Sequence, residues 1–174
     1  MSATHRLRQG LRALLACARP LDDTLPARYL TGPQLDLFRR MQRSEQQHGI
    51  NVLRDVLDQE PTTPDDLAVA ALLHDLGKIH QPLPVWSKTL TVLIRAFLPA
   101  RFERWSQGNI ANPLHRGCIV MVQHPVWGGE LAAQSGVSEP AVWLISHHAD
   151  SLARWSGHPH CALLERLQLA DNAN

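Results

Sequence analysis

Helix signals recur along almost the whole sequence, and they are the feature that most limits the folds open to this chain. Near the start, Thr31 is a capping residue followed by Pro33, and apolar residues at helical spacing then continue to about residue 60. Similar starts and stops predict five further helices, over about 62–77, 84–99, 112–133, 138–148 and 161–171. No longer segment alternates as a strand does. The sequence therefore predicts an all-α fold, in which Pro125 should kink or divide its helix.

Length and composition predict one domain that neither binds a nucleic acid polymer nor spans a membrane. The 174 residues fit a single domain, with an N-terminal helical extension over 1–30, a helical bundle of five or more core helices over 31–174 and a helical insertion at about 84–110. The 17 basic residues balance 16 acidic ones, so charge indicates no nucleic acid polymer as partner. No apolar run reaches the roughly 20 residues of a membrane span. Three cysteines without a CxxC spacing favour a cytoplasmic location.

Histidine and aspartate residues recur near the middle or end of several expected helices, which could bring them to one point. Imidazole and carboxylate groups together suit transition metals, of which iron and manganese are favoured here, with zinc, cobalt or nickel as alternatives. One tetrahedral ion needs about four ligands, so seven candidates indicate two ions that share a carboxylate. The candidates are His48, His74, Asp75, His124, His147, His148 and Asp171.

Four short motifs follow one another along the chain. ALLHDLGKI at residues 71–79 resembles the HDxGK signature of the HD superfamily of metal-dependent phosphohydrolases, and HPVWGGELA from His124 resembles a second motif of that superfamily. The His147-His148 pair and LQLADN, which contains Asp171, complete the series. The resemblance covers about residues 45–171 and is closer to the HD-GYP branch than to the single-metal nucleotidases.

The resemblance implies the role of each candidate. It assigns His48, His74, Asp75 and Asp171 to one ion, and Asp75, His124, His147 and His148 to the other. Asp75 would then be the bridge, and a hydroxide between the ions would be the nucleophile. Lys78 resembles the family lysine that contacts a substrate phosphate, as a compact positive charge. The implied activity is hydrolysis of a phosphate ester of a small, nucleotide-like molecule.

Departures from the family pattern leave other functions open. The Gly-Tyr-Pro signature is missing and only Gly157-His158-Pro159 lies nearby, so a cyclic dinucleotide is a doubtful substrate. Glu45 lies three residues before His48, where it gives no support to a third metal. The superfamily also contains diiron oxygenases, and related domains serve as non-catalytic nucleotide sensors. The sequence leaves the substrate, the metal and the oligomeric state open.

The remaining aromatic and histidine residues are expected to be structural. The aromatic and basic segment from Trp86 to Trp105 has apolar residues at helical spacing, which usually indicates core packing rather than a membrane surface or a cover over the site. Three tryptophans flank the candidate ligands and are expected to pack behind them, namely Trp127, Trp143 and Trp155. The other histidines are taken as ordinary, although His158 could line the site.

Overall fold

The computed structural model describes residues 21–60 and 62–174, and the whole described chain is built from helices and connecting turns. The all-α prediction is thus confirmed. In chain order the α-helices are α2 (Thr24–Tyr29), α3 (Gly32–Arg40), α4 (Arg43–Gln59), α5 (Asp65–Leu73), α6 (Val85–Phe97), α7 (Pro99–Ser106), α8 (Pro113–Gln134), α9 (Glu139–His147) and α10 (Cys161–Ala173). Two short 3₁₀ helices, η1 (Leu76–His80) and η2 (Leu152–Trp155), lie between them.

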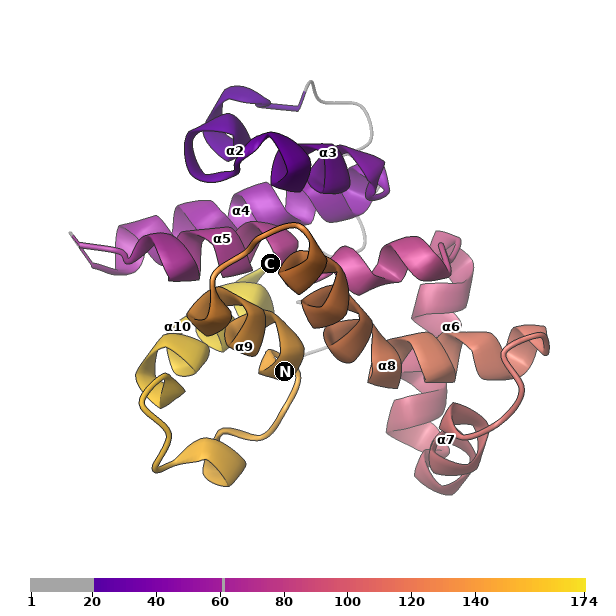
Figure 1. Cartoon of the computed structure of the whole chain (residues 1–174). Coiled ribbons are helices and arrows are strands. Elements are labelled where there is room, and N and C mark those ends of the chain that lie inside the picture. The colour runs from indigo at the N-terminus through magenta and orange to yellow at the C-terminus, as the bar shows by residue number, and fades with distance from the viewer. Residues whose placement is uncertain (1–20, 61) are drawn as a thin grey trace.

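Helix α5 lies at the centre of the bundle. Its sequence DDLAVAALL is apolar after the first turn, and most of its side chains are completely buried. A helix that is apolar on all sides has to be surrounded, and α5 packs against α4, α9 and α10 (Figure 1). Because α5 ends at Leu73, the His74-Asp75 pair follows directly after the most buried helix of the fold.

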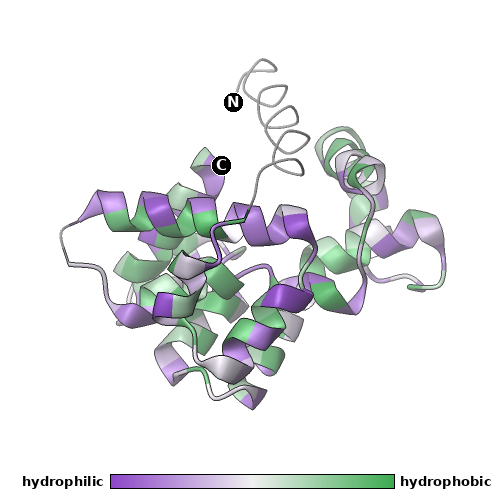
Figure 2. Cartoon of the chain, turned by 90° about the horizontal axis from the view of Figure 1, so that it is seen from above, coloured by the Kyte–Doolittle hydropathy of each residue, from purple (hydrophilic) through white to green (hydrophobic). Residues whose placement is uncertain are grey.

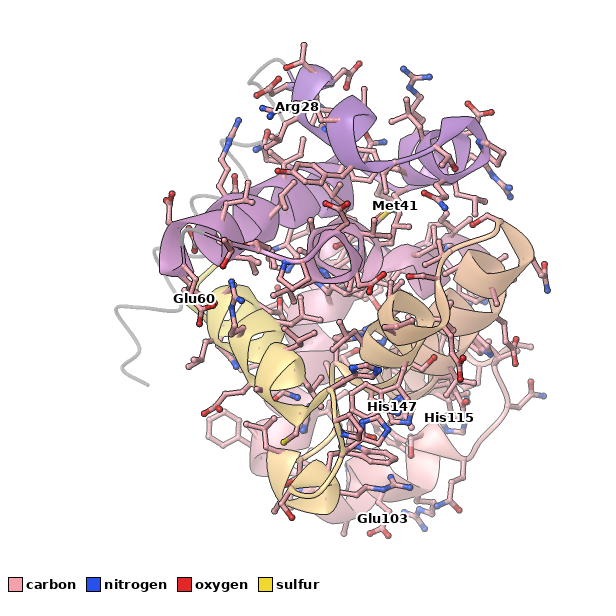
Figure 3. All side chains as sticks on the ribbon, turned by 60° about the vertical axis from the view of Figure 1, so that its left-hand side comes forward. Arg28, Met41, Glu60, Glu103, His115 and His147 are labelled. Carbon is pink, nitrogen blue, oxygen red and sulfur yellow. The ribbon has the colours of Figure 1, made fainter. Side chains whose placement is uncertain are left out.

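The prediction of one long helix from residue 31 to about 60 is wrong, because the structure has two helices there. Met41 and Gln42 have extended backbone angles, so α3 ends at Arg40 and α4 begins at Arg43. The side-chain amide of Gln46 donates hydrogen bonds to the carbonyl oxygens of Arg39 (3.0 Å) and Met41 (2.8 Å), which would otherwise lack partners at the helix end. The buried Met41 side chain holds this junction against the core (Figure 3).

Helix α8 is a single helix of 22 residues that continues through Pro125. The proline therefore does not divide it, although it lacks an N–H group for the usual hydrogen bond. Asn112 caps its start by accepting a hydrogen bond from the N–H of Leu114. This continuity fixes His124 in the middle of α8, where it faces η1.

The expected insertion contains two helices, α6 and α7, which reach away from the bundle beside α8 (Figure 1). The expected core packing of its aromatic residues is wrong, because Trp86 is 65% exposed, Phe97 is 75% exposed and no residue of α7 is buried. Only one side of α6 contacts the rest of the fold.

Two sequence expectations concern the ends of the domain and the membrane. Residues 1–20 of the expected N-terminal extension lie outside the described residues, and the boundary at residue 30 stays a prediction. In the described part, α2 packs against α5, and Leu30 after it is buried. No helix among the described residues is long and apolar enough to cross a membrane.

Candidate metal centre

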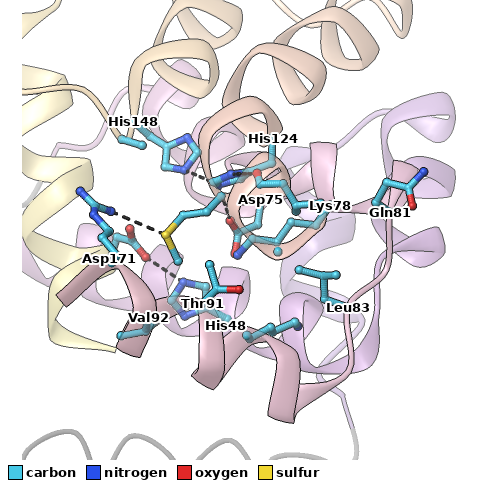
Figure 4. A pocket seen from close by; sticks show the side chains of 16 residues that line it. His48, Asp75, Lys78, Gln81, Leu83, Thr91, Val92, His124, His148 and Asp171 are labelled. Atoms are coloured by element: carbon cyan, nitrogen blue, oxygen red, sulfur yellow. Dashed lines mark hydrogen bonds and ion pairs between the residues drawn. The ribbon is translucent and has the colours of Figure 1, made fainter. Parts of the chain in front are cut away.

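Six of the seven candidate ligands meet in one place. His48 comes from α4, His74 and Asp75 from the turn after α5, and His124 from α8. His148 follows α9 and Asp171 comes from α10. The ligand atoms of His48, His74 and Asp75 lie within 4.8 Å of one another, and so do those of Asp75, His124 and His148. Figure 4 shows five of these side chains around one pocket.

Asp75 belongs to both groups, and its two oxygens face different histidines. Oδ2 lies 3.6 Å from Nε2 of His74, whereas Oδ1 lies 3.3 Å from Nε2 of His124. Two ligand atoms that are each about 2.1 Å from one ion lie roughly 3 to 3.5 Å apart. These distances therefore fit a carboxylate that holds one ion with each oxygen.

Asp171 completes the first group. Its Oδ1 lies 2.8 Å from Nε2 of His48 and 3.6 Å from Nε2 of His74. The Nε2 atom of His74 is buried and lacks a hydrogen-bond partner, although it faces two carboxylates. An unsatisfied buried nitrogen is costly in a folded protein, and a bound cation between it and these carboxylates would satisfy it.

Three of the imidazoles are oriented in the way that metal ligands usually are. The Nδ1 atoms of His74, His124 and His148 donate hydrogen bonds to the backbone carbonyls of Ala71, Val120 and Ile145. In the neutral ring this leaves Nε2 without a proton and free to bind a cation. The Nε2 atoms of His124 and His148 lie only 3.2 Å apart. Two bare nitrogens repel each other at that distance unless they share a proton or a metal ion.

Burial and neighbouring charges set the protonation of this cluster. Burial raises the pKa of Asp75, but Lys78, His74 and His124 outweigh it and hold that pKa well below its usual range. For His74, burial lowers the pKa, yet the carboxylates of Asp75 and Asp171 raise it to about 9. Burial and the neighbouring His74 and His124 lower the pKa of His148 to about 3. At neutral pH the carboxylates of Asp75 and Asp171 are ionised and His148 is neutral, whereas His74 carries a proton that an arriving metal ion has to displace.

His147 is the one candidate that the structure does not bring into the cluster. Its Nδ1 donates a hydrogen bond to the carbonyl oxygen of Trp143 at 2.8 Å. Its ring stacks on the Trp143 indole at a centroid distance of 4.7 Å and contacts the Trp155 ring edge to face. The ring of His158 also stacks on the Trp143 indole, at a centroid distance of 4.0 Å, and His158 does not line the pocket. Metal ligation by His147 stays a prediction.

The two lysines of the chain both lie beside the cluster, and they hold one buried glutamate between them. Lys78 lies 2.7 Å from Oδ2 of Asp75 and 3.7 Å from Oε2 of Glu45. Lys88, on α6, forms a close ion pair with Oε1 of Glu45 and donates a hydrogen bond to Gln42. Both oxygens of Glu45 thus face ammonium groups, which leaves no support here for a third metal ion.

A cavity of about 300 Å³ opens next to the cluster (Figure 4). One wall consists of metal-cluster residues and Lys78, and the opposite wall is a face of α6. The positions on α6 follow helical spacing and are Lys88, Thr91, Val92 and Arg95. Sequence reasoning gave covering of the site only as an alternative for this segment and missed these four positions, although Lys88 is one of only two lysines and the four positions share one helix face.

Comparison with known families agrees with this geometry. The family model of the HD domain matches residues 36–173. The chain therefore belongs to the HD domain family, which is part of a superfamily of metal-dependent hydrolases. No curated protein and no solved structure matches the chain. The expected resemblance to the HD superfamily is thereby confirmed, while the HD-GYP branch stays a prediction.

Proposed function

We propose that this protein hydrolyses a phosphate ester of a small, nucleotide-like molecule at a centre of two divalent metal ions. The observation that carries the proposal is the placement of Asp75. The two oxygens of its buried carboxylate face two different groups of imidazoles. When bound, two transition-metal ions would supply a hydroxide at neutral pH and neutralise phosphoryl oxygens. Iron and manganese are the proposed metals, because the donor set is imidazole and carboxylate.

The ligands of the proposed ions follow from the two groups. His48, His74, Asp75 and Asp171 would hold the first ion, and Asp75, His124 and His148 the second. The second ion would keep an open coordination position. It could be filled by water and substrate, or by His147 if its ring left the stack on Trp143. The carbonyl hydrogen bonds at Nδ1 fix three of the rings, so the centre is already arranged before an ion arrives.

The cavity beside the centre supports a small anionic substrate. Its volume of about 300 Å³ is at the lower end of the range for ligand pockets. Lys78 reaches it with a side chain that is 28% exposed, and Arg95 adds a second positive charge from α6. Leu83, Val92 and Met121 give the cavity an apolar part that suits a base or another ring. A screen of phosphomonoesters, cyclic nucleotides and dinucleotides, with protein purified anaerobically and its metals measured, tests the proposal.

Lys78→Ala is expected to lower kcat/KM by about 10- to 150-fold while the metal content stays unchanged. The ammonium cannot bind a cation, but a lost charge-assisted contact with phosphate costs roughly 1.5 to 3 kcal/mol. Lys78→Arg should recover only part of the loss, because a planar fork replaces a compact charge. Steady-state kinetics on the ester found in the screen, with metal analysis of the same samples, gives the answer.

An unchanged kcat/KM in Lys78→Ala at full metal occupancy would reduce Lys78 to an ion-pair partner of Asp75 and Glu45. The diiron oxygenase alternative would then gain weight, and oxygen consumption by the iron-loaded protein would decide it. Binding of nucleotides without turnover would instead favour a sensor module.

A further inference from the structure

Helix α6 carries an apolar stripe that no described part of the fold covers. Its residues are Trp86, Leu90, Leu93 and Phe97, with exposed fractions of 65%, 37%, 46% and 75%. Their spacing of four, three and four residues places them within about 60° of the helix circumference. The buried residues of α6 lie on another side and are Ser87, Thr91 and Ile94. The stripe is thus separate both from the packed side and from the pocket wall.

Exposed hydrophobic residues are concentrated in this part of the molecule. Of the eleven large hydrophobic residues that are exposed in the described chain, seven lie between Val85 and Leu98. In Figure 2, hydrophobic colour extends to the right-hand helices, the side where Figure 1 places α6 and α7. Single exposed hydrophobic residues are ordinary, but a contiguous patch indicates an interaction surface.

The same region is basic, although the chain as a whole is almost neutral. Residues 79–129 contain five of the 17 lysines and arginines and only one of the 16 acidic residues, Glu103. On α7, Arg101 and Arg104 are exposed, and Arg95 is exposed on α6. We use the name α6–α7 face for the exposed residues Trp86, Leu90, Leu93 and Phe97 of α6 together with the exposed Arg101 and Arg104 of the adjoining α7, a set that combines apolar and positively charged side chains.

We propose that the α6–α7 face docks on an anionic lipid surface, with the apolar stripe of α6 entering the headgroup region. Amphipathic helices that lie on membranes combine aromatic and aliphatic residues with nearby arginine or lysine in this way. A second copy of the chain fits less well, since a two-fold interface would bring together two copies of the same positively charged face. Nucleic acid fits less well too, because Arg101 and Arg104 offer few contacts to phosphates, and Leu90 and Leu93 lie between the two aromatic residues of the stripe.

The test is co-sedimentation of the full-length protein with vesicles, at low and at physiological salt. Vesicles of phosphatidylglycerol and phosphatidylcholine should bind the protein, whereas phosphatidylcholine alone should bind it weakly. Phe97→Ser should weaken binding roughly 10-fold. Leu169→Ser is the matched control, because Leu169 is 61% exposed but lies on α10. Arg101→Gln combined with Arg104→Gln should weaken binding to anionic vesicles about 30-fold, at about 1 kcal/mol for each basic residue.

Three results would overturn the proposal. The first is absence of binding to anionic vesicles, and the second is equal binding by Phe97→Ser and Leu169→Ser. The third is a wild-type dimer that Phe97→Ser converts to a monomer, measured by light scattering, which would assign the face to a second copy. Unchanged thermal unfolding and metal content in the variants show that the fold and the metal centre are intact. The proposal does not depend on the proposed hydrolysis.

Discussion

Asp75→Ala is expected to lose both metal ions and to lower phosphate-ester hydrolysis by more than roughly 100-fold. Removing an outer partner of a metal ligand typically costs 10- to 100-fold, and Asp75 is proposed to be a ligand of two ions. The physical reason is its placement, since Oδ2 faces His74 at 3.6 Å and Oδ1 faces His124 at 3.3 Å. The measurements are metal content by elemental analysis and kcat/KM on the same preparation.

Two other variants make the Asp75 result specific. His48→Ala removes a ligand of the first ion only, so the ion held by His124 and His148 should be partly retained. Asp58→Ala removes an exposed carboxylate of α4 outside the cluster and should change neither the metal content nor kcat/KM. If Asp75→Ala and His48→Ala hold equal amounts of metal, Asp75 is not the bridge.

Gly77→Ala is expected to destabilise the protein by about 3 kcal/mol or more, because overpacking against backbone cannot be relieved by moving a side chain. Gly77 lies in η1, where a Cβ atom would collide with the carbonyl oxygen of His124 and lie 2.7 Å from the backbone nitrogen of Gly128. For a chain of this size the loss corresponds to a fall in Tm of roughly 6 to 12 °C. Thermal unfolding followed by circular dichroism measures it.

The close packing at Gly77 should also affect the metal centre, because η1 contacts the turn of α8 that contains His124. Forcing the two backbones apart would separate Asp75 from His124, so the second ion should bind more weakly in Gly77→Ala. Gly157→Ala is the matched control, since a Cβ atom at Gly157 meets nothing within 4 Å. Equal Tm values for the two variants would contradict the close packing of η1 on α8.

The helices could be predicted from sequence where caps and apolar spacing agree. The core helix around Ala68 and Leu72 and the last helix from Cys161 follow from such patterns. The break at Met41 could not be predicted, because apolar spacing continues across it and the break depends on the amide of Gln46 bonding two carbonyls. The exposure of Phe97 was also missed, since helical spacing alone does not tell which apolar face meets the core.

For the site, the order of motifs indicated the candidate residues but not their distances. Six of them converge because α4, α5, α8, α9 and α10 end or cross near one point, which is a property of tertiary packing. His147 and His148 are neighbours in the sequence, yet one ring points to the cluster and the other stacks on Trp143. The pairing of Glu45 with Lys88 joins residues 43 positions apart, so no local pattern reports it.

The most direct test of the account is the number of metal ions per chain. Protein purified anaerobically with iron and manganese present, then freed of loosely bound metal, should contain about two transition-metal ions per chain by elemental analysis. The expectation follows from one buried carboxylate shared by two groups of imidazoles. A content of one ion or none per folded chain would contradict the binuclear centre.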